Sequence, residues 1–255
     1  MDISFETPDF GILNELMDKE SQKNIDNEKN PRVKELLKEI KLSKDNYEII
    51  QLCARVHELD PDNFKIFADE GRAFYYLNQF ERAERSYLAG ILKAEQQKNG
   101  VPAFLIMSFA IFLFGINKYD EVIACCDKVI ENRYDYPTAW GLKGMTLLEL
   151  KRYSEAIGCS DIAISQDPEF ALFWDTKIFS LIHHVGYEEA LKCCKEGLEI
   201  NPKSDLLLFE MAGIYYKLNN FQLAYDFLIE CKSVNPNYNC HKLLDNVIEK
   251  LNQFK

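Results

Sequence analysis

The sequence lacks the patterns on which catalysis and metal binding usually depend. Its 255 residues include only four histidines, and none of them stands in an HExxH context. No serine or cysteine nucleophile motif is present, and no glycine-rich loop that could cradle a phosphate. We therefore expect a protein that is not an enzyme and that carries neither a cofactor nor a metal ion.

Positive charge is also scarce. Lysine and arginine number 30 against 41 aspartate and glutamate residues, which gives a net charge of −11. Nucleic-acid binding needs clustered cations that neutralise phosphates, and anionic membrane surfaces attract the same residues. The charge therefore argues against both kinds of partner. The 47% of hydrophobic residues is enough for the core of a soluble globular protein.

The start of the sequence has no recognisable export signal, because it holds neither a basic stretch nor a continuous apolar one. We expect a cytoplasmic location, with a nuclear one as the alternative, and eight cysteines that are thiols. Cys125, Cys159 and Cys193 are 34 residues apart. If this spacing reflects a repeated helical unit, packed helices lie about 8–10 Å apart, whereas a disulfide needs Cα atoms about 4.4–6.8 Å apart. These cysteines are therefore expected in the core.

One uncharged run stands out, Val101–Ile116, which has sixteen residues. A membrane-spanning helix needs about 20 apolar residues, so this run is short for that purpose. It also begins with Pro102 at its second position. The run therefore favours a helix that is covered on all sides by protein, and a membrane span is the less favoured alternative.

The segment Pro137–Phe170 predicts two amphipathic helices joined by a tight turn. Apolar residues recur at helical spacing in both halves, with Tyr153 at the turn and Pro168 ending the second helix. The small residues Gly144 and Ala156 stand where two helices would approach closely. The segment thus reads W-x2-K-G-x2-L, then A-x3-S, then P.

This pattern resembles the tetratricopeptide repeat, whose 34-residue unit reads W-x2-L-G-x2-Y, A-x3-F and P. The same columns recur along the chain, with units starting near residues 30, 64, 103, 137, 171 and 205. The turn aromatic returns as Phe80, Tyr119, Tyr153, Tyr187 and Phe221. The resemblance implies an all-α fold, a right-handed superhelical solenoid of stacked helix-turn-helix hairpins.

The spacing of the repeat predicts that the chain has three parts. Residues 30–238 are the predicted repeat array, and residues 239–255 are a capping helix whose outer face is polar, as terminal repeats require. Residues 1–29 form an N-terminal segment with apolar side chains between Ile3 and Met17. That segment is either a disordered tail or a partly ordered piece that docks on the array, as a cap or inside its groove.

The resemblance also implies a concave face lined by the first helix of each unit, at its second, fifth, sixth, ninth and twelfth positions. From these positions we predict eleven apolar residues as the partner-binding groove, namely Phe104, Met107, Ile111, Phe114, Leu142, Met145, Leu148, Leu172, Phe179, Phe209 and Tyr216. Acidic residues fall at such positions as well, namely Asp69, Asp175 and Glu210. A contiguous apolar patch of this kind usually marks a partner site. Some of these side chains could instead pack between neighbouring helices.

We therefore expect a non-catalytic scaffold or adaptor whose groove binds a helical or extended apolar segment of a partner protein. One alternative is a complex subunit that self-associates through the groove as a homo-oligomer. Another is a chaperone cofactor with a carboxylate clamp, which needs lysine and asparagine donors. The matching positions counted from residue 64 hold Ala68, Arg72, Ser108, Thr138 and Leu142, so a clamp is disfavoured.

Overall fold

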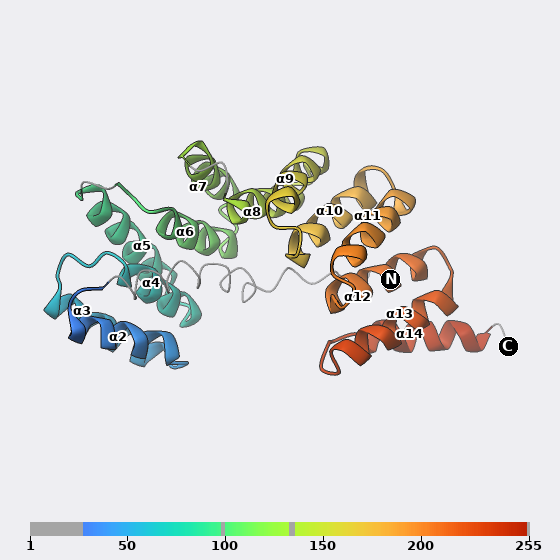
Figure 1. Ribbon diagram of the computed structural model, residues 1–255, viewed down its shortest axis with the longest axis horizontal. Helices are drawn as coiled ribbons and strands as arrows, with labels where there is room; N and C mark the ends of the chain where they lie inside the picture. Colours follow the sequence, from blue (N-terminus) through green and yellow to red (C-terminus); the bar gives the residue numbers. More distant parts are fainter. Residues whose placement is uncertain (1–27, 98–99, 133–135, 254–255) are drawn as a thin grey trace. The chain divides into compact units, whose positions relative to one another are not determined.

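The computed structural model describes residues 28–97, 100–132 and 136–253 (Figure 1). Within these ranges the chain forms thirteen α-helices and no strand. This confirms the all-α solenoid of stacked hairpins. The apolar positions from Ile3 to Met17, which the sequence offered as a docking segment, lie outside the described residues.

The described helices pair into six hairpins, and we name the first helix of each the A helix and the second the B helix. The A helices begin within two residues of the predicted unit starts. The first three hairpins comprise α2 (Pro31–Leu42), α3 (Asn46–Leu59), α4 (Ile66–Tyr76), α5 (Phe80–Glu95), α6 (Ala103–Gly115) and α7 (Tyr119–Asn132). The others comprise α8 (Pro137–Glu149), α9 (Tyr153–Gln166), α10 (Ala171–His184), α11 (Tyr187–Ile200), α12 (Asp205–Lys217) and α13 (Phe221–Val234), and are followed by α14 (His241–Gln253).

The chain divides into two compact units, Met1–Tyr134 and Asp135–Lys255. Unit 1 contains the hairpins from α2 to α7, and unit 2 contains those from α8 to α13 together with α14. The right-handed superhelical twist expected of the whole array stays a prediction, as do the limits of 30–238 for the array.

Unit 2 is built from a row of A helices and a row of B helices, which can be followed in Figure 1. Helix α10 packs against both α8 and α12 in the A row. The B helices α9 and α11 each pack against their own A helix and the A helix that follows. Helix α14 closes the stack on α13, burying Leu243 and Val247 and exposing Lys242, Asp245 and Glu249.

Small residues let helices of neighbouring hairpins approach one another. A Cβ added at Gly141 of α8 would lie 2.1 Å from Cε1 of Phe173, a fully buried side chain of α10. At Gly197 of α11, an added Cβ would lie 2.9 Å from Cδ1 of Leu207 in α12. These glycines are therefore sites where a neighbouring hairpin inserts a large side chain.

The turn inside four hairpins is closed by one residue in the left-handed conformation, as in a Schellman motif. The residues are Asn78, Asn117, Lys151 and Asn219, with φ between 57° and 60°. In each turn two backbone N–H groups donate hydrogen bonds to carbonyl groups in the last turn of the A helix. The N–H of Lys151 donates to the Leu148 carbonyl and that of Arg152 to the Leu147 carbonyl, both at 2.8 Å. The turn between α10 and α11 uses Gly186, with φ of 134°.

Helix α6 is covered on every side, as its composition predicted. All ten side chains between Phe104 and Phe114 other than Ser108 are buried. The hydroxyl of Ser108 donates to the Phe104 carbonyl at 2.8 Å. Of the helices in the described ranges, none combines the length and the apolar character needed to cross a membrane.

Gly141→Ala tests the close approach of α8 and α10. The added methyl group overpacks a filled space, which typically costs about 1–3 kcal/mol, so we expect a lower urea midpoint. Gly158 of α9 is the matched control, because an added Cβ there meets nothing within 4 Å. Gly158→Ala should stabilise by about 0.5–1 kcal/mol through the lower backbone entropy of the unfolded chain. Equal midpoints for the two variants would contradict this packing.

Lys151→Asn tests the turn geometry. Left-handed backbone costs a side chain with a full Cβ about 1–2 kcal/mol, and asparagine tolerates it better. We expect the urea midpoint to rise by the equivalent of about 1 kcal/mol. The reciprocal change Asn219→Lys, at a position with the same φ of 59°, should lower it by a similar amount. Shifts of the same sign in both variants would refute the account.

Candidate functional site

The eleven residues predicted to line the groove lie on A helices of both units. In unit 1, Phe104, Met107, Ile111 and Phe114 are all buried in α6. In unit 2, Leu142, Met145, Leu172 and Phe179 are buried, whereas Leu148, Phe209 and Tyr216 are partly exposed. Their role in partner binding stays a prediction, and the partly exposed three are the ones a partner could reach directly.

The twelfth A-helix position has a recurring structural contact. Phe114 packs against the turn aromatic Tyr119 with ring centroids 5.6 Å apart, and Tyr216 packs against Phe221 at the same distance. The equivalent pair in the second hairpin is Tyr75 with Phe80, at 5.8 Å. Residues at this position therefore anchor the turn, whatever else they contact.

Two acidic side chains lie buried between the A helices α10 and α12 of unit 2. Asp175 is 7% exposed and Glu210 is 3% exposed. They occupy the fifth position of α10 and the sixth position of α12, counted from the start of each helix. Because these helices pack directly on each other, the two carboxyl groups lie within range of each other's charge.

Neither carboxyl group is satisfied by a hydrogen bond at its buried oxygen. Oδ1 of Asp175 and Oε2 of Glu210 are enclosed and have no partner among the described residues. Buried polar atoms in folded proteins are nearly always hydrogen-bonded, and a buried unpaired charge is strongly unfavourable. Two neighbouring carboxyl oxygens without hydrogen bonds therefore need an explanation: either the groups are protonated, or a ligand binds them.

Burial disfavours the charged form of both groups. Loss of solvation raises the pKa of Asp175 to about 7. The pKa of Glu210 is also raised, first by burial and then by the negative charge of Asp175. Because the groups interact, their protons leave in two steps that belong to the pair. At neutral pH the pair therefore holds at least part of its protons.

Among the described residues, the titratable groups that act on the pair or respond to it bring no positive charge. Burial raises the pKa of the Cys194 thiol on α11, and the Glu210 and Asp175 carboxyls add to that effect. Tyr238, which precedes α14, has a phenol pKa raised by burial and then by Glu210. Its ring packs against Phe209 with centroids 5.4 Å apart.

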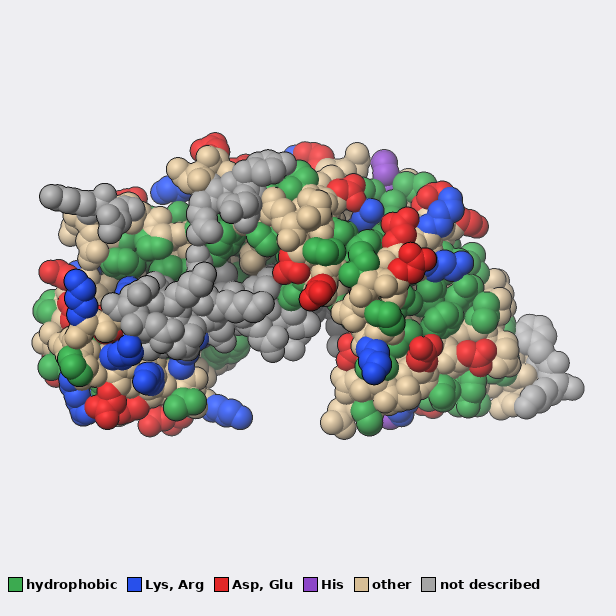
Figure 2. Space-filling model, in the orientation of Figure 1, with side chains coloured by type: hydrophobic (Ala, Val, Ile, Leu, Met, Phe, Trp, Pro, Cys, Tyr) green, Lys and Arg blue, Asp and Glu red, His purple; other side chains and the backbone are tan. Residues whose placement is uncertain are grey.

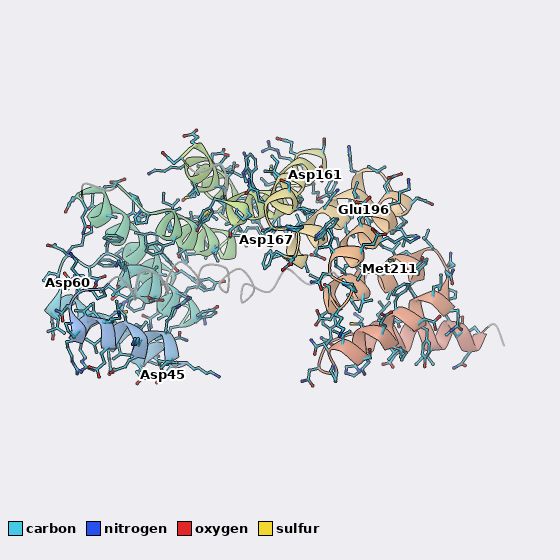
Figure 3. The ribbon with its side chains drawn as sticks, in the orientation of Figure 1. Asp45, Asp60, Asp161, Asp167, Glu196 and Met211 are labelled. Atoms are coloured by element: carbon cyan, nitrogen blue, oxygen red, sulfur yellow. The ribbon has the colours of Figure 1, made fainter. Side chains whose placement is uncertain are left out.

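The lysine nearest to Asp175 in sequence is directed to the B helices. Nζ of Lys177 lies 2.8 Å from Oδ1 of Asp161 on α9, and Glu196 of α11 adds to the negative charge around it. Figure 3 labels Asp161 and Glu196 on these two B helices. Asp161, outside the A row, is therefore compensated by a cation, in contrast to the pair inside it.

The outer surface of unit 2 is mixed in character. Figure 2 shows hydrophobic side chains interspersed with acidic and basic ones on this unit. Leu223 and Ile229 of α13 are examples of exposed apolar residues, at 36% and 44% exposure. Single exposed apolar residues are normal on protein surfaces and indicate no site.

The comparisons with known proteins concern the fold. No protein-family model matches the sequence, and no curated protein matches it. The solved structure of TTC0263, a thermophilic TPR protein of Thermus thermophilus, superposes with a TM-score of 0.57 at 11% identity, over 74% of this chain and 98% of that one. This chain has the tetratricopeptide-repeat fold.

Two further structures with this repeat architecture are similar. The APC/C hetero-tetramer Cut9–Hcn1 matches with a TM-score of 0.65 at 12% identity, over 91% of this chain and 45% of that chain. YrrB, described as a TPR protein with an unusual peptide-binding site, matches with a TM-score of 0.51 at 14% identity, over 73% of this chain and 93% of that one. Identities this low establish a shared repeat fold and leave function open.

The raised pKa values predict how stability depends on pH. The pKa of Asp175 lies near 7 in the folded chain and about 3.9 in an unfolded one. Its contribution to stability is therefore complete below about pH 4 and is lost as pH rises through 7. Urea midpoints of the wild type should fall over this range, by the equivalent of roughly 2–4 kcal/mol more than those of Asp175→Asn. Parallel profiles for the two proteins would show that Asp175 does not titrate in this way.

Proposed function

We propose that this protein is a non-catalytic scaffold or adaptor whose A-helix face binds a helical or extended segment of a partner protein. The observation that supports this is the apolar character of the A helices at the predicted groove positions. Leu148, Phe209 and Tyr216 are large and remain partly exposed there. Aromatic and aliphatic side chains of this kind adapt to apolar helices or strands.

The chemistry of the cysteines supports a role without catalysis. A nucleophilic cysteine needs a lowered pKa, because the thiolate is the reactive form. Burial instead raises the pKa of Cys193 to about 12 and that of Cys125 to about 11. Cys193 is buried as expected, whereas Cys125 is partly exposed and so does not lie in the core as the sequence predicted. With raised pKa values, both thiols are expected to be unreactive.

Similar structures support an interaction role by analogy. YrrB is described as having a peptide-binding site, and Cut9 was solved as a hetero-tetramer with Hcn1. The carboxylate-clamp alternative finds no support in unit 2. In the frame that starts at residue 137, Glu210 stands where a clamp needs a cation. A carboxylate there repels the acidic ligand that a clamp binds.

The groove hypothesis is tested by a charge placed on the partly exposed face. We expect the double variant Leu148→Glu and Phe209→Glu to lose the partner proteins that the wild type captures from source cells, because a carboxylate cannot be buried against an apolar segment. The matched control is Leu223→Glu with Ile229→Glu, two exposed apolar residues of the B helix α13. Quantitative mass spectrometry of the captured proteins is the measurement.

Two outcomes decide between the proposal and its alternative. Capture by the Leu148/Phe209 variant at the level of the control would end the groove model. Light scattering of the purified protein separates adaptor from self-associating subunit. A monomer supports the adaptor, whereas a stable dimer that the same variant dissociates supports self-association through the groove.

A further inference from the structure

We infer that Asp175 and Glu210 form a recognition site for a basic side chain, the ammonium group of a lysine or the guanidinium group of an arginine, carried by the bound partner. The inference rests on the proposed function, because it concerns the segment held on the A-helix face of unit 2. It adds a charge requirement to a face that is otherwise apolar.

The first argument is position. Asp175 and Glu210 come from A helices that pack directly against each other, at the fifth and sixth positions of the two helices. The resemblance to the tetratricopeptide repeat predicts that these positions face the groove. A single cation at either carboxyl group would therefore also lie within range of the charge of the other.

The second argument is that the described residues offer no partner to the buried carboxyl oxygens. Each carboxyl group has a fully buried oxygen that lacks a hydrogen-bond partner among the described residues. Lys177, two residues after Asp175, is already paired with Asp161 of α9. A basic group from outside would supply the missing donors and neutralise the mutual repulsion of the two carboxylates.

The third argument is the character of the surroundings. Lysine and arginine carry long apolar stems that lie well on aromatic surfaces while the charged end reaches a polar group. Phe209 and Tyr238 pack against each other next to the pair, and both are partly exposed. The phenol pKa of Tyr238 responds to both carboxyl groups, so the aromatic surface and the acidic pair are neighbours.

Binding of a cation is coupled to the release of protons. The free pair retains protons at neutral pH because burial disfavours its charged form. A cation favours the charged form, so both carboxyl groups ionise when it binds. A structural pair that merely shares a proton would show no such coupling to an added cation, which provides a clear experimental distinction.

The test uses the full chain and n-butylammonium chloride, a mimic of the lysine side chain. At pH 7 we expect saturable shifts of the carboxyl ¹³C resonances of Asp175 and Glu210, with half-saturation at roughly millimolar concentration, as a ligand of so few atoms allows. Equal concentrations of 1-butanol and of sodium chloride should give no saturable shift. Potassium hydroxide uptake at constant pH should report protons released on binding.

Matched variants assign the effect to the pair. Asp175→Asn with Glu210→Gln should weaken n-butylammonium binding at least tenfold, and Asp161→Asn, which removes an acid paired on the B-helix side, should leave it unchanged. Glu210→Lys supplies an internal ammonium beside Asp175 and should abolish binding. It serves as the test if the double variant does not fold.

Saturable binding that persists in the double variant or in Glu210→Lys, or no saturable shift in the wild type, would overturn the inference. The result is independent of the groove model. Failure of n-butylammonium binding with normal, groove-dependent partner capture rejects only the cation site. Binding of n-butylammonium with no partner capture rejects only the adaptor function.

Discussion

Within each compact unit, a hairpin covers only part of its own apolar surface, and contact with neighbouring hairpins of that unit covers more of it. The insertion of Phe173 from α10 against Gly141 of α8 shows the constraint at atomic scale, because no side chain at Gly141 fits beside that ring. Such contacts fix how closely successive A helices approach. The position of every residue on the A-helix face, apolar or acidic, depends on this spacing.

Much of the fold could be predicted from the sequence, because the residues that define the repeat act through local contacts. The turn aromatics Tyr119 and Tyr153 each begin a B helix, and the helix of Val101–Ile116 is buried on all sides as its composition requires. A proline, an aromatic and a small residue at fixed spacing carry this information. Their physical effects act within one hairpin or between adjacent ones.

The remaining features depend on which side chains meet across hairpins. The sequence offered Met107 and Met145 as groove residues, but only the structure shows that both are buried. The acidic pair was equally hard to foresee: Asp175 and Glu210 are separated by 34 intervening residues, and a lone acid on a helix is ordinarily solvated. The left-handed turn residues could have been found, since asparagine recurs at 78, 117 and 219. The unit that starts at residue 137 has Lys151 at this turn position, so the asparagine pattern is interrupted in the unit with the clearest repeat motif.

The turn between α10 and α11 shows how the repeat tolerates a change of length. Helix α10 has 14 residues where α8 and α12 have 13, and its left-handed residue Gly186 directly precedes the turn aromatic Tyr187. In the hairpin before it, one residue separates Lys151 from Tyr153. Helix α10 is therefore one residue longer and its turn one residue shorter, so the 34-residue period is preserved. A connection with this freedom lets an individual helix grow or shrink by a residue while the neighbouring hairpins keep their alignment.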